Sequence, residues 1–536
     1  MKKRVVSMVL ALVMLCNLTV SAWAEDPIVA SGQCGDSDTE SRIQWLLWNT
    51  GKLEISGEGH MEHYSRNRVP WKKYKEQITE VVIYGPQDEL KSCVLSIGNY
   101  AFYGCANLTT VTIPETVAVI GSYAFSGCKS LKEITLPDSV GRIGDWAFAE
   151  SGIKSICLPK ELTSIGDGVF SYCENLANVT FSSKLTSIGL RAFSETGLTR
   201  VAIPSTVTEI ERDAFLSCEK LEYVWLPYGL EKISGRLFGY CSSLKGVEIP
   251  PTVRTISYSA FQDCSSLESI IIPPGVETIE NGAFARCESM TEITIPDSVK
   301  TIMTAAFIQC KRLTEITIPV GVTEIGGRVF MECDNLQAVY VAEDNPAFQS
   351  VDGALMSKDG TTLYYYPGKK EESYEIPEGV TTLQQDAIYG CPNLKTIVFP
   401  STLKTAYSMA IEACPKLTSC FFRGPGMEDF NNLGAYGATF YYIEGQPGWT
   451  SPTCYGHQTA LWDGGSLIPG TLLDGDINGD SKVDATDLQQ LYGYLTGQVT
   501  LGMAQKMAAD YNGDGVVDVY DLQALYEHLA LQGTAQ

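Results

Sequence analysis

One pattern of apolar and polar positions recurs along most of the chain. A clear copy lies between Cys105 and Cys128, and similar copies follow one another from about residue 78 to about residue 423. A pattern that returns at a fixed period of about 20–50 residues is typical of a solenoid. In this copy the apolar positions are Leu108, Val111, Ile113, Val117, Ile120, Ala124 and Phe125.

Each copy predicts one short strand that ends in a turn. Residues 108–113, 131–136 and 313–318 alternate apolar and polar side chains, and each segment is followed directly by proline. Alternation sends the apolar side chains to one face of a strand, and proline ends the ladder because it has no N–H to donate. One copy cannot cover its own apolar face, so we expect the copies to stack into a parallel sheet around a continuous core.

The repeat resembles the BspA-like branch of the leucine-rich repeats. The resemblance rests on Leu-x-x-Ile-x-Ile-Pro, then Val-x-x-Ile, then Ala-Phe and Cys, repeated in register over well over half of the chain. It implies a curved or gently twisted solenoid outside the cell that binds other molecules. The predicted fold class is therefore mainly β solenoid, with repeats of about 23 residues and caps, plus a small all-α calcium-binding module at the C-terminus.

Departures from the repeat predict the domain boundaries. At the N-terminus, Lys2, Lys3 and Arg4 precede an apolar stretch that ends at Ala22-Trp23-Ala24, which is typical of a secretory signal peptide. Around residue 359 the turn Lys358-Asp359-Gly360 predicts a β-hairpin. The predicted parts are a signal peptide (1–24), an N-terminal cap (25–77), the solenoid (78–424, with a hairpin insert at about 343–374), a C-terminal cap (425–465), a linker (466–473) and the C-terminal module (474–536).

Cysteine recurs at one position of the repeat. A small, weakly polar thiol is easily buried, and a bond between two rungs would break their equivalence, so we expect free thiols there; disulfides between adjacent rungs are the alternative. Two copies, Glu150-Ser-Gly-Ile153 and Glu195-Thr-Gly-Leu198, lack the cysteine and predict a shortened turn. The off-ladder residues Cys34, Cys93, Cys157, Cys420 and Cys454 are better disulfide candidates.

The net charge narrows the possible partners. A formal charge of -24 disfavours binding to nucleic acid and to anionic lipid. It suits calcium or basic partners, or else a solvated acidic surface with no specific role. No second apolar stretch is long enough to span a membrane, so we expect a secreted protein.

Two 12-residue segments near the C-terminus predict calcium sites. They begin 34 residues apart, at Asp476 and Asp510, and carry oxygen-bearing side chains at positions 1, 3, 5, 9 and 12. Together with a main-chain carbonyl at position 7, such a set suits calcium. The predicted ligands are Asp476, Asn478, Asp480, Lys482, Asp484 and Asp487 in the first loop, and Asp510, Asn512, Asp514, Val516, Asp518 and Asp521 in the second.

Each loop leads into a predicted helix with one apolar stripe, and the pair resembles the type I dockerin. The stripes start at Leu488 and Leu522 and repeat the same spacing. The resemblance implies two calcium ions and a cohesin module of a scaffold as the partner. Ser481 replaces the usual glycine at position 6, which costs about 1 kcal/mol and weakens the first site. The implied cohesin contacts are Ala485, Thr486, Tyr492, Val519, Tyr520 and Tyr526, and because the two copies differ there, the docking orientation and the cohesin type stay open.

Nothing in the sequence predicts catalysis. His60 and His63 are three residues apart without an evident third metal ligand, and the common nucleophile, phosphate-loop and zinc-protease motifs are missing from the sequence. We therefore expect a non-enzymatic protein; a site assembled from several coils is the alternative.

The outward side chains of the strands form the predicted ligand face. Arg200, Tyr223, Trp225 and Glu248 fall on neighbouring coils, and exposed aromatic residues on a sheet suit a protein or glycan ligand. The alternative is a scatter of surface aromatic residues. Other residues predicted to point outward are Glu292, Glu315, Tyr340, Val398 and Phe421.

Three functions follow from these observations. The first is a secreted, non-catalytic recognition subunit that docks onto the cohesin scaffold of a cellulosome-like, polysaccharide-degrading assembly. The second is a stand-alone adhesin that binds host or microbial surface proteins and uses calcium only for stability. The third is an enzyme subunit with a hidden site.

Overall fold

A computed structural model describes residues 27–39, 41–85, 93–368, 370–427, 433–462, 472–480, 482–513 and 515–532. The predicted signal peptide lies outside these residues, as do residues 466–471 of the predicted linker, Ser481 and Asp514.

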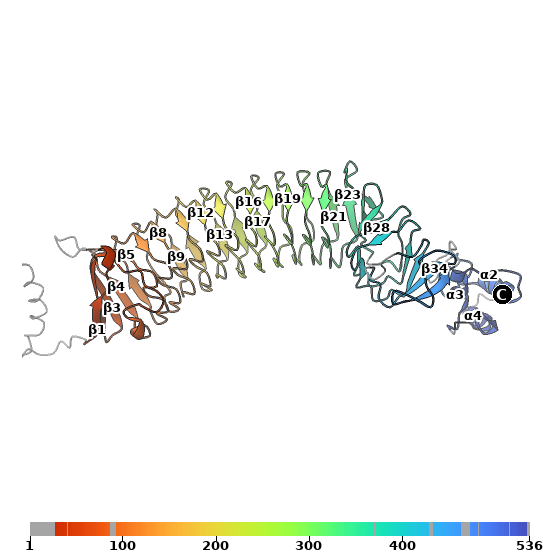
Figure 1. The fold of residues 1–536 in the computed structure, drawn as a ribbon, viewed down its shortest axis with the longest axis horizontal. Coiled ribbons are helices and arrows are strands. Elements are labelled where there is room, and N and C mark those ends of the chain that lie inside the picture. The colour runs from red at the N-terminus through yellow and green to blue at the C-terminus, as the bar shows by residue number, and fades with distance from the viewer. Residues whose placement is uncertain are drawn as a thin grey trace, which may run out of the picture.

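The chain forms a β-solenoid of about 16 turns, which stack into a curved rod (Figure 1). This confirms the predicted fold class. The strands of the Leu-x-x-Val-x-Ile segments pair in parallel and in register, so that Val201 lies beside Val224, and Val224 beside Val247. These strands are β4 (Glu80–Ile83), β6 (Thr110–Thr112), β9 (Ser155–Cys157), β11 (Asn178–Thr180), β13 (Arg200–Ala202), β15 (Tyr223–Trp225), β17 (Gly246–Glu248), β21 (Glu315–Ile318), β23 (Ala338–Val341), β27 (Ser373–Glu375), β30 (Thr396–Phe399) and β33 (Ser419–Phe422).

A second parallel ladder runs through the Val-x-x-Ile segments. Most of its strands are two residues long, and each sends its second residue into the core, as Ile233 and Ile256 do. They are β5 (Val94–Ile97), β7 (Val119–Ile120), β8 (Arg142–Ile143), β10 (Ser164–Ile165), β12 (Ser187–Ile188), β14 (Glu209–Ile210), β16 (Lys232–Ile233), β18 (Thr255–Ile256), β19 (Thr278–Ile279), β20 (Thr301–Ile302), β22 (Glu324–Ile325), β28 (Thr382–Leu383) and β31 (Thr405–Ala406). Near the C-terminal end, β29 (Ile388–Tyr389) pairs with β32 (Ile411–Glu412).

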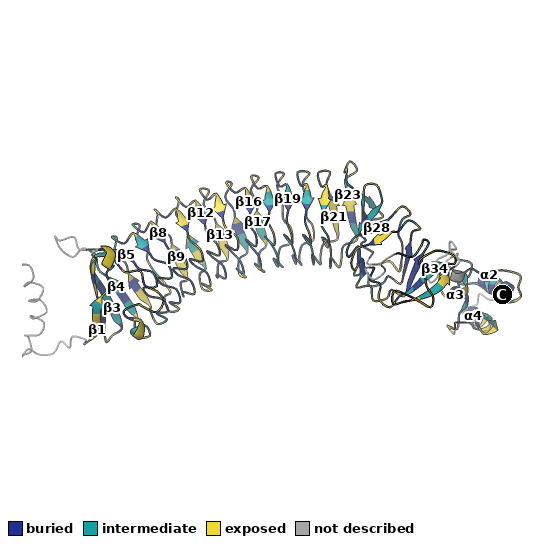
Figure 2. Ribbon diagram, viewed as in Figure 1, coloured by how far each residue is buried: buried dark blue, intermediate teal, exposed yellow. Residues whose placement is uncertain are grey.

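The core is a stack of equivalent side chains, and the buried residues follow the coils along the whole rod (Figure 2). The phenylalanine of each Ala-Phe pair stacks on that of the next coil, with ring centroids 5.1 Å apart between Phe102 and Phe125 and 6.2 Å apart between Phe307 and Phe330. At the N-terminal end Trp71 continues this stack, 5.7 Å from Phe102. Each coil therefore covers the apolar surface of its neighbour.

Buried thiols form a second stack beside the phenylalanines. Cys241, Cys264 and Cys287 each donate a hydrogen bond of 3.2 Å to the main-chain carbonyl of a phenylalanine in the preceding coil. The off-ladder disulfide candidates Cys34, Cys93, Cys157, Cys420 and Cys454 are free thiols, so that expectation is wrong. Cys34 and Cys454 lie at opposite ends of the rod, and Cys157 is an exposed residue of β9, so these three cannot meet.

The two ends and one insert depart from the regular coil. At the N-terminal end β1 and β2 are antiparallel, and β3 joins them to the parallel ladder. Between β23 and β28, where the rod changes direction in Figure 1, three antiparallel strands interrupt the coils. These elements are β1 (Ile28–Gln33), η1 (Ser37–Thr39), β2 (Arg42–Trp48), β3 (Lys52–His60), η2 (Lys72–Tyr74), β24 (Phe348–Val351), β25 (Ala354–Ser357), β26 (Thr362–Tyr365), β34 (Thr439–Ile443), β35 (Thr453–Cys454) and β36 (His457–Trp462).

Candidate functional site

The C-terminal module is built from the two predicted loops and three helices, α2 (Ala485–Leu495), α3 (Met503–Ala509) and α4 (Val519–Gln532). Leu491 of α2 and Leu525 of α4 are fully buried in one small core, together with Ile477 of the first loop. The apolar stripe of each predicted helix therefore faces the other helix. The short helix α3 was not predicted, because it carries no repeated stripe of its own.

In the first loop a buried carboxylate ties the start of the loop to the start of the helix. Asp487 is fully buried, and it accepts hydrogen bonds from the main-chain N–H groups of Ile477 (2.7 Å), Asn478 (2.9 Å) and Asp484 (3.0 Å). Asp476 is also buried and accepts from the N–H of Gly479 at 2.8 Å. These bonds hold the loop in a tight turn.

The second loop repeats the bonds of the buried carboxylate, whereas its first aspartate is less buried than Asp476 and has a partner two residues further along the loop. Asp521 is fully buried and accepts from the N–H groups of Asn512 (3.1 Å) and Asp518 (2.8 Å), while Asp510 accepts from Gly515 (2.8 Å). The 34-residue duplication in the sequence is therefore a duplication of structure.

The described residues of the loops fit a calcium ion. A buried carboxylate is costly unless its charge is compensated, and among the described residues Asp487 and Asp521 are bonded to main-chain N–H groups and to no lysine or arginine. No three acidic, histidine or cysteine side chains gather as a metal cluster in the described parts of the chain. The predicted set instead mixes carboxylates with the amides of Asn478 and Asn512 and with main-chain carbonyls, a mixture that calcium prefers.

A groove of about 420 Å³ lies between α2 and α4. Four of the six predicted cohesin contacts line it, and Tyr492 and Tyr526 are each about half exposed, at 55% and 52%. The other two contacts lie outside: Thr486 donates to Asp484 at 2.6 Å and so braces the loop, and Tyr520 is exposed. The lining consists of four equivalent pairs, Ala485 and Val519, Leu488 and Leu522, Gln489 and Gln523, and Tyr492 and Tyr526.

On the solenoid, the structure places the four predicted ligand-face residues side by side. Arg200 pairs with Tyr223 across β13 and β15, and Trp225 pairs with Glu248 across β15 and β17. The guanidinium carbon of Arg200 lies 5.2 Å from the centroid of the Tyr223 ring. Tyr223, Trp225 and Glu248 line a hollow of about 510 Å³, to which Gly246, Ser269 and Ile271 also contribute.

Two residues of the predicted outward face are instead buried. Val398 and Phe421 are completely covered, because Trp462 packs against Phe421 with ring centroids 5.3 Å apart. The prediction that they are exposed is therefore wrong. The alternation of side chains placed Val398 and Phe421 correctly on the outer side of their strands. It could not indicate that the segment of Trp462 covers that side.

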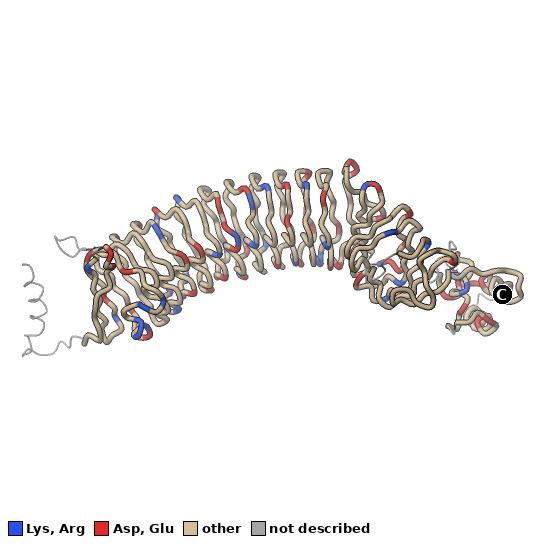
Figure 3. The backbone as a smooth tube through the Cα atoms, in the orientation of Figure 1, with Lys and Arg blue, Asp and Glu red and all other residues tan. Residues whose placement is uncertain are grey.

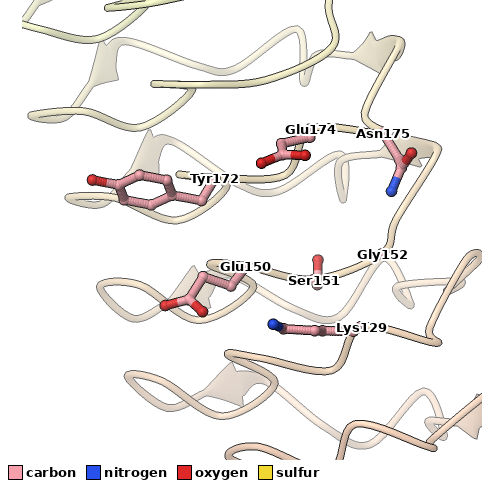
Figure 4. Close-up of a pocket in the computed structure, with 7 residues that line it drawn as sticks. All are labelled: Lys129, Glu150, Ser151, Gly152, Tyr172, Glu174 and Asn175. Carbon is pink, nitrogen blue, oxygen red and sulfur yellow. The ribbon is translucent and has the colours of Figure 1, made fainter.

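The two shortened coils form hollows that were not predicted. At Gly152 the chain passes so close to the preceding coil that a Cβ atom would lie 2.1 Å from the carbonyl oxygen of Lys129. The resulting hollow of about 380 Å³ is lined by Lys129, Glu150, Ser151, Gly152, Tyr172, Glu174 and Asn175 (Figure 4). The second shortened coil forms a similar hollow of about 510 Å³, where burial raises the pKa of Glu195.

Charged residues of both signs are interspersed along the coils (Figure 3). Lysine and glutamate pair across neighbouring coils, for example Lys300 with Glu277 at 2.8 Å and Lys311 with Glu288 at 2.7 Å. Such exposed pairs contribute little to stability, typically about 0–1 kcal/mol each.

The BspA type leucine-rich repeat region matches residues 95–222, 208–337 and 361–436, which is more than half of the chain. The chain belongs to the BspA-type leucine-rich repeat family. The type I dockerin domain matches residues 474–530. This confirms both resemblances.

The chain is similar to several solved structures, and the first of those given below has the same fold. A leucine-rich repeat protein from Bacteroides ovatus is 23% identical, with 79% of this chain and 100% of that chain covered and a TM-score of 0.51. A leucine-rich repeat protein from Eubacterium ventriosum is 22% identical (75% and 99% covered, TM-score 0.37), and a leucine-rich cell surface protein from Faecalibacterium prausnitzii is 23% identical (75% and 96% covered, TM-score 0.34). No curated protein matches the chain.

These matches define the general character of the BspA-type protein. Leucine-rich repeats and dockerins are non-catalytic binding modules that are typical of extracellular proteins. Type I dockerins generally bind calcium and imply a cohesin partner. Within the described residues, no helix is both long and apolar enough to cross a membrane.

Proposed function

We propose that this protein is a secreted, non-catalytic binding subunit that docks through its dockerin onto the cohesin scaffold of a cellulosome-like, polysaccharide-degrading assembly. The solenoid then presents a recognition surface to the substrate or to a neighbouring surface. The observation that carries the proposal is the groove between α2 and α4, where an exposed apolar lining repeats with the 34-residue period of the loops. A soluble module of this size has no structural need to expose four equivalent pairs of largely apolar residues.

Calcium has a structural role in this proposal. When bound, it supplies the positive charge that the buried carboxylates of both loops need, and it thereby fixes the start of α2 and of α4. The two sites would be held by Asp476, Asn478, Asp480, Lys482, Asp484 and Asp487, and by Asp510, Asn512, Asp514, Val516, Asp518 and Asp521.

The calcium loops are connected to the groove through the first residues of α2 and α4. Asp484 accepts a hydrogen bond from the N–H of Thr486 at 2.8 Å and caps α2, whose first residue, Ala485, lines the groove. Asp518 accepts from Tyr520 at 2.8 Å in the same way at α4. A loop that loses its ion releases this end of the helix, so docking is expected to depend on calcium.

The parts of the chain have separate roles in the proposal. Residues 1–24 direct secretion, residues 25–465 form the capped recognition solenoid with its hairpin insert, residues 466–473 link the solenoid to the dockerin, and residues 474–536 dock onto the scaffold. Ala485, Thr486, Tyr492, Val519, Tyr520 and Tyr526 are the proposed cohesin contacts.

A capture experiment tests this function. The full-length protein is incubated with an immobilised panel of type I cohesins in calcium, and a variant with Asp476→Ala and Asp510→Ala is incubated in parallel. We expect at least one cohesin to retain the native chain and to lose the variant. A folded, calcium-binding chain that no cohesin retains would instead favour the stand-alone adhesin.

A further inference from the structure

The hollow on the solenoid lies where a regular column of outward-pointing threonines on the strand face is replaced by other residues. The second outward position of the strand segment is an exposed threonine in many coils, at residues 112, 135, 180, 294 and 317. Three consecutive coils instead carry Trp225, Glu248 and Ile271, and Trp225 and Ile271 are 47% and 82% exposed. A β-branched threonine suits an exposed strand. Large apolar residues gain nothing there from the fold itself, so their clustering points to a ligand.

Gly246 opens the centre of this hollow. It is the first residue of β17, and it lies between Tyr223 on one side and the coil of Ser269 on the other. A glycine inside a strand weakens the strand, and it often marks a place where a ligand approaches closely. A Cβ atom at this position would lie 3.3 Å from the Tyr223 ring, so even a small side chain would begin to close the space.

The Tyr223 ring has one covered face and one open face. Arg200, from the preceding coil, lies over the ring at 5.2 Å. The opposite face is directed toward the next coil, where Gly246 has no side chain to cover it. Trp225 stands beside Tyr223 with a centroid distance of 6.4 Å and an interplanar angle of 29°. The two rings therefore form an aromatic wall on one side of the hollow.

Polar groups complete the lining. Glu248 is exposed and, among the described residues, has no ion-pair partner, while Lys245 is held by Glu222 at 3.1 Å. Ser269 contributes a hydroxyl on the far side. An aromatic wall with a few placed donors and acceptors is typical of a site that orients one small ring.

The size of the patch favours a sugar over a protein. Three coils and two outward residues cover about 100 Å² of sheet, whereas a stable protein interface buries about 800 Å² on each partner. A volume of about 510 Å³ is large enough for one or two sugar rings. The negative π face of an aromatic ring attracts the C–H face of a pyranose, and the Glu248 carboxylate would repel an anionic sugar.

We propose that the hollow lined by Tyr223, Trp225, Gly246, Glu248, Ser269 and Ile271 binds a neutral pyranose ring of a glycan chain. The ring stacks on the open face of Tyr223 above Gly246, and its hydroxyls reach Glu248 and Ser269. This inference rests on the proposed function, because it names the ligand class of the recognition surface.

Calorimetric titration of the full-length protein tests the inference, with β-1,4-linked hexasaccharides of glucose, xylose and mannose as neutral probes and a galacturonic acid hexasaccharide as the anionic probe. We expect at least one neutral probe to bind and the anionic probe to fail. Tyr223→Ala and Gly246→Leu should each weaken binding at least tenfold, the first by removing the wall and the second by filling the space. Tyr407→Ala removes an exposed aromatic residue of the solenoid outside the strand face and should leave binding unchanged.

Each other outcome overturns the inference. It fails if no neutral probe binds, if the anionic probe binds best, or if Tyr223→Ala, on the solenoid surface, leaves the affinity unchanged while the protein stays folded by circular dichroism. A peptide or protein that binds the hollow in place of every sugar would also contradict it. The calorimetric titration contains no cohesin, so a failure of cohesin capture does not affect its result. Conversely, a failure of sugar binding does not affect the result of the capture experiment.

Discussion

At the scale of single residues, every regular coil contains two positions with left-handed backbone, and most of them are not glycine. In one coil they are Ser259 (φ 52°) and Asp263 (φ 58°). Each costs about 1–2 kcal/mol for a residue with a side chain. The cost is offset because the N–H of each residue bonds to a carbonyl of the next coil, at 2.9 Å for Ser259 and 2.8 Å for Asp263.

Ala305 allows this cost to be measured. Its φ is 58°, and glycine occupies the equivalent position at Gly282. Ala305→Gly should raise the free energy of unfolding by about 0.5–1 kcal/mol, because glycine adopts this conformation without steric cost. Urea unfolding of the two proteins provides the measurement. The neighbouring Ala306→Gly is the control and should lower the free energy of unfolding, since Ala306 is fully buried and has no left-handed backbone; equal destabilisation by both changes would contradict the account.

The buried thiols should be chemically silent in the folded protein. Burial raises the pKa of Cys173 to about 11 and that of Cys264 well above its ordinary value of 9.0. Because the folded state holds these thiols protonated, their contribution to stability is complete at neutral pH and is lost as the pH rises from about 9 toward 11. Iodoacetamide at pH 8 should therefore modify exposed Cys157 and leave Cys173 and Cys264 unmodified until urea is added. Mass spectrometry measures the modification of each cysteine. Equal modification of Cys157 and Cys264 in the native protein would contradict the prediction that the buried thiols do not react.

At the scale of elements, the repeat itself could be predicted because apolar and polar side chains alternate along each strand segment. The second ladder could not, since strands of two residues such as β16 and β18 are too short to show a period. The helix α3 and the cover over Phe421 were missed for a related reason. They arise from contacts between distant segments, as between Phe421 and Trp462, and not from a local pattern.

The two loops were the most predictable part of the candidate site, because each expected calcium ligand lies at a fixed offset from the first aspartate of its loop. The groove was predicted only in part. Tyr492 and Tyr526 follow from the dockerin resemblance, whereas Gln489 and Gln523 line the same groove and could have been found from the 34-residue spacing alone. The hollow on the solenoid also had a signal in the sequence, because Gly246 is a glycine inside a strand segment.

Calcium binding at one loop can be measured separately from calcium binding at the other loop. Asp487→Ala and Asp521→Ala each remove the buried carboxylate that joins loop and helix, so titration of calcium into chelator-treated protein should show two sites in the native chain and one in each variant. At a calcium concentration of about 100 times its dissociation constant, each lost site lowers the stability of the module by about 2.7 kcal/mol. Asp334→Ala, an exposed change on the solenoid, should keep both sites. A native chain that binds no calcium would contradict the dockerin account.

At the scale of the whole molecule, the rod is a one-dimensional stack in which each coil contacts only its neighbours. A defect in one coil should therefore remain local. Phe215 stacks on Phe193 at 5.4 Å and on Phe238 at 5.9 Å, and it is fully buried.

Phe215→Ala should cost about 3–5 kcal/mol at that point of the rod. Hydrogen exchange should show faster exchange in the coils of Phe193 to Phe238, with unchanged exchange in the dockerin helices. A matched surface change, Tyr228→Ala, should leave exchange unaltered along the rod, because Tyr228 is exposed. Uniformly faster exchange over the whole chain would show that the molecule unfolds as one unit, contrary to this description.

In the proposed function, this separation lets the dockerin attach to a scaffold while the solenoid recognises a ligand. The central claim is that attachment depends on calcium held by the dockerin loops. Its most direct test is surface plasmon resonance of the full-length protein on a panel of immobilised type I cohesins, with a pulse of EGTA followed by the return of calcium. The account predicts capture by at least one cohesin, release in EGTA and renewed capture of fresh protein after calcium is restored. Absence of capture by every cohesin, or capture that EGTA leaves unchanged, would contradict it.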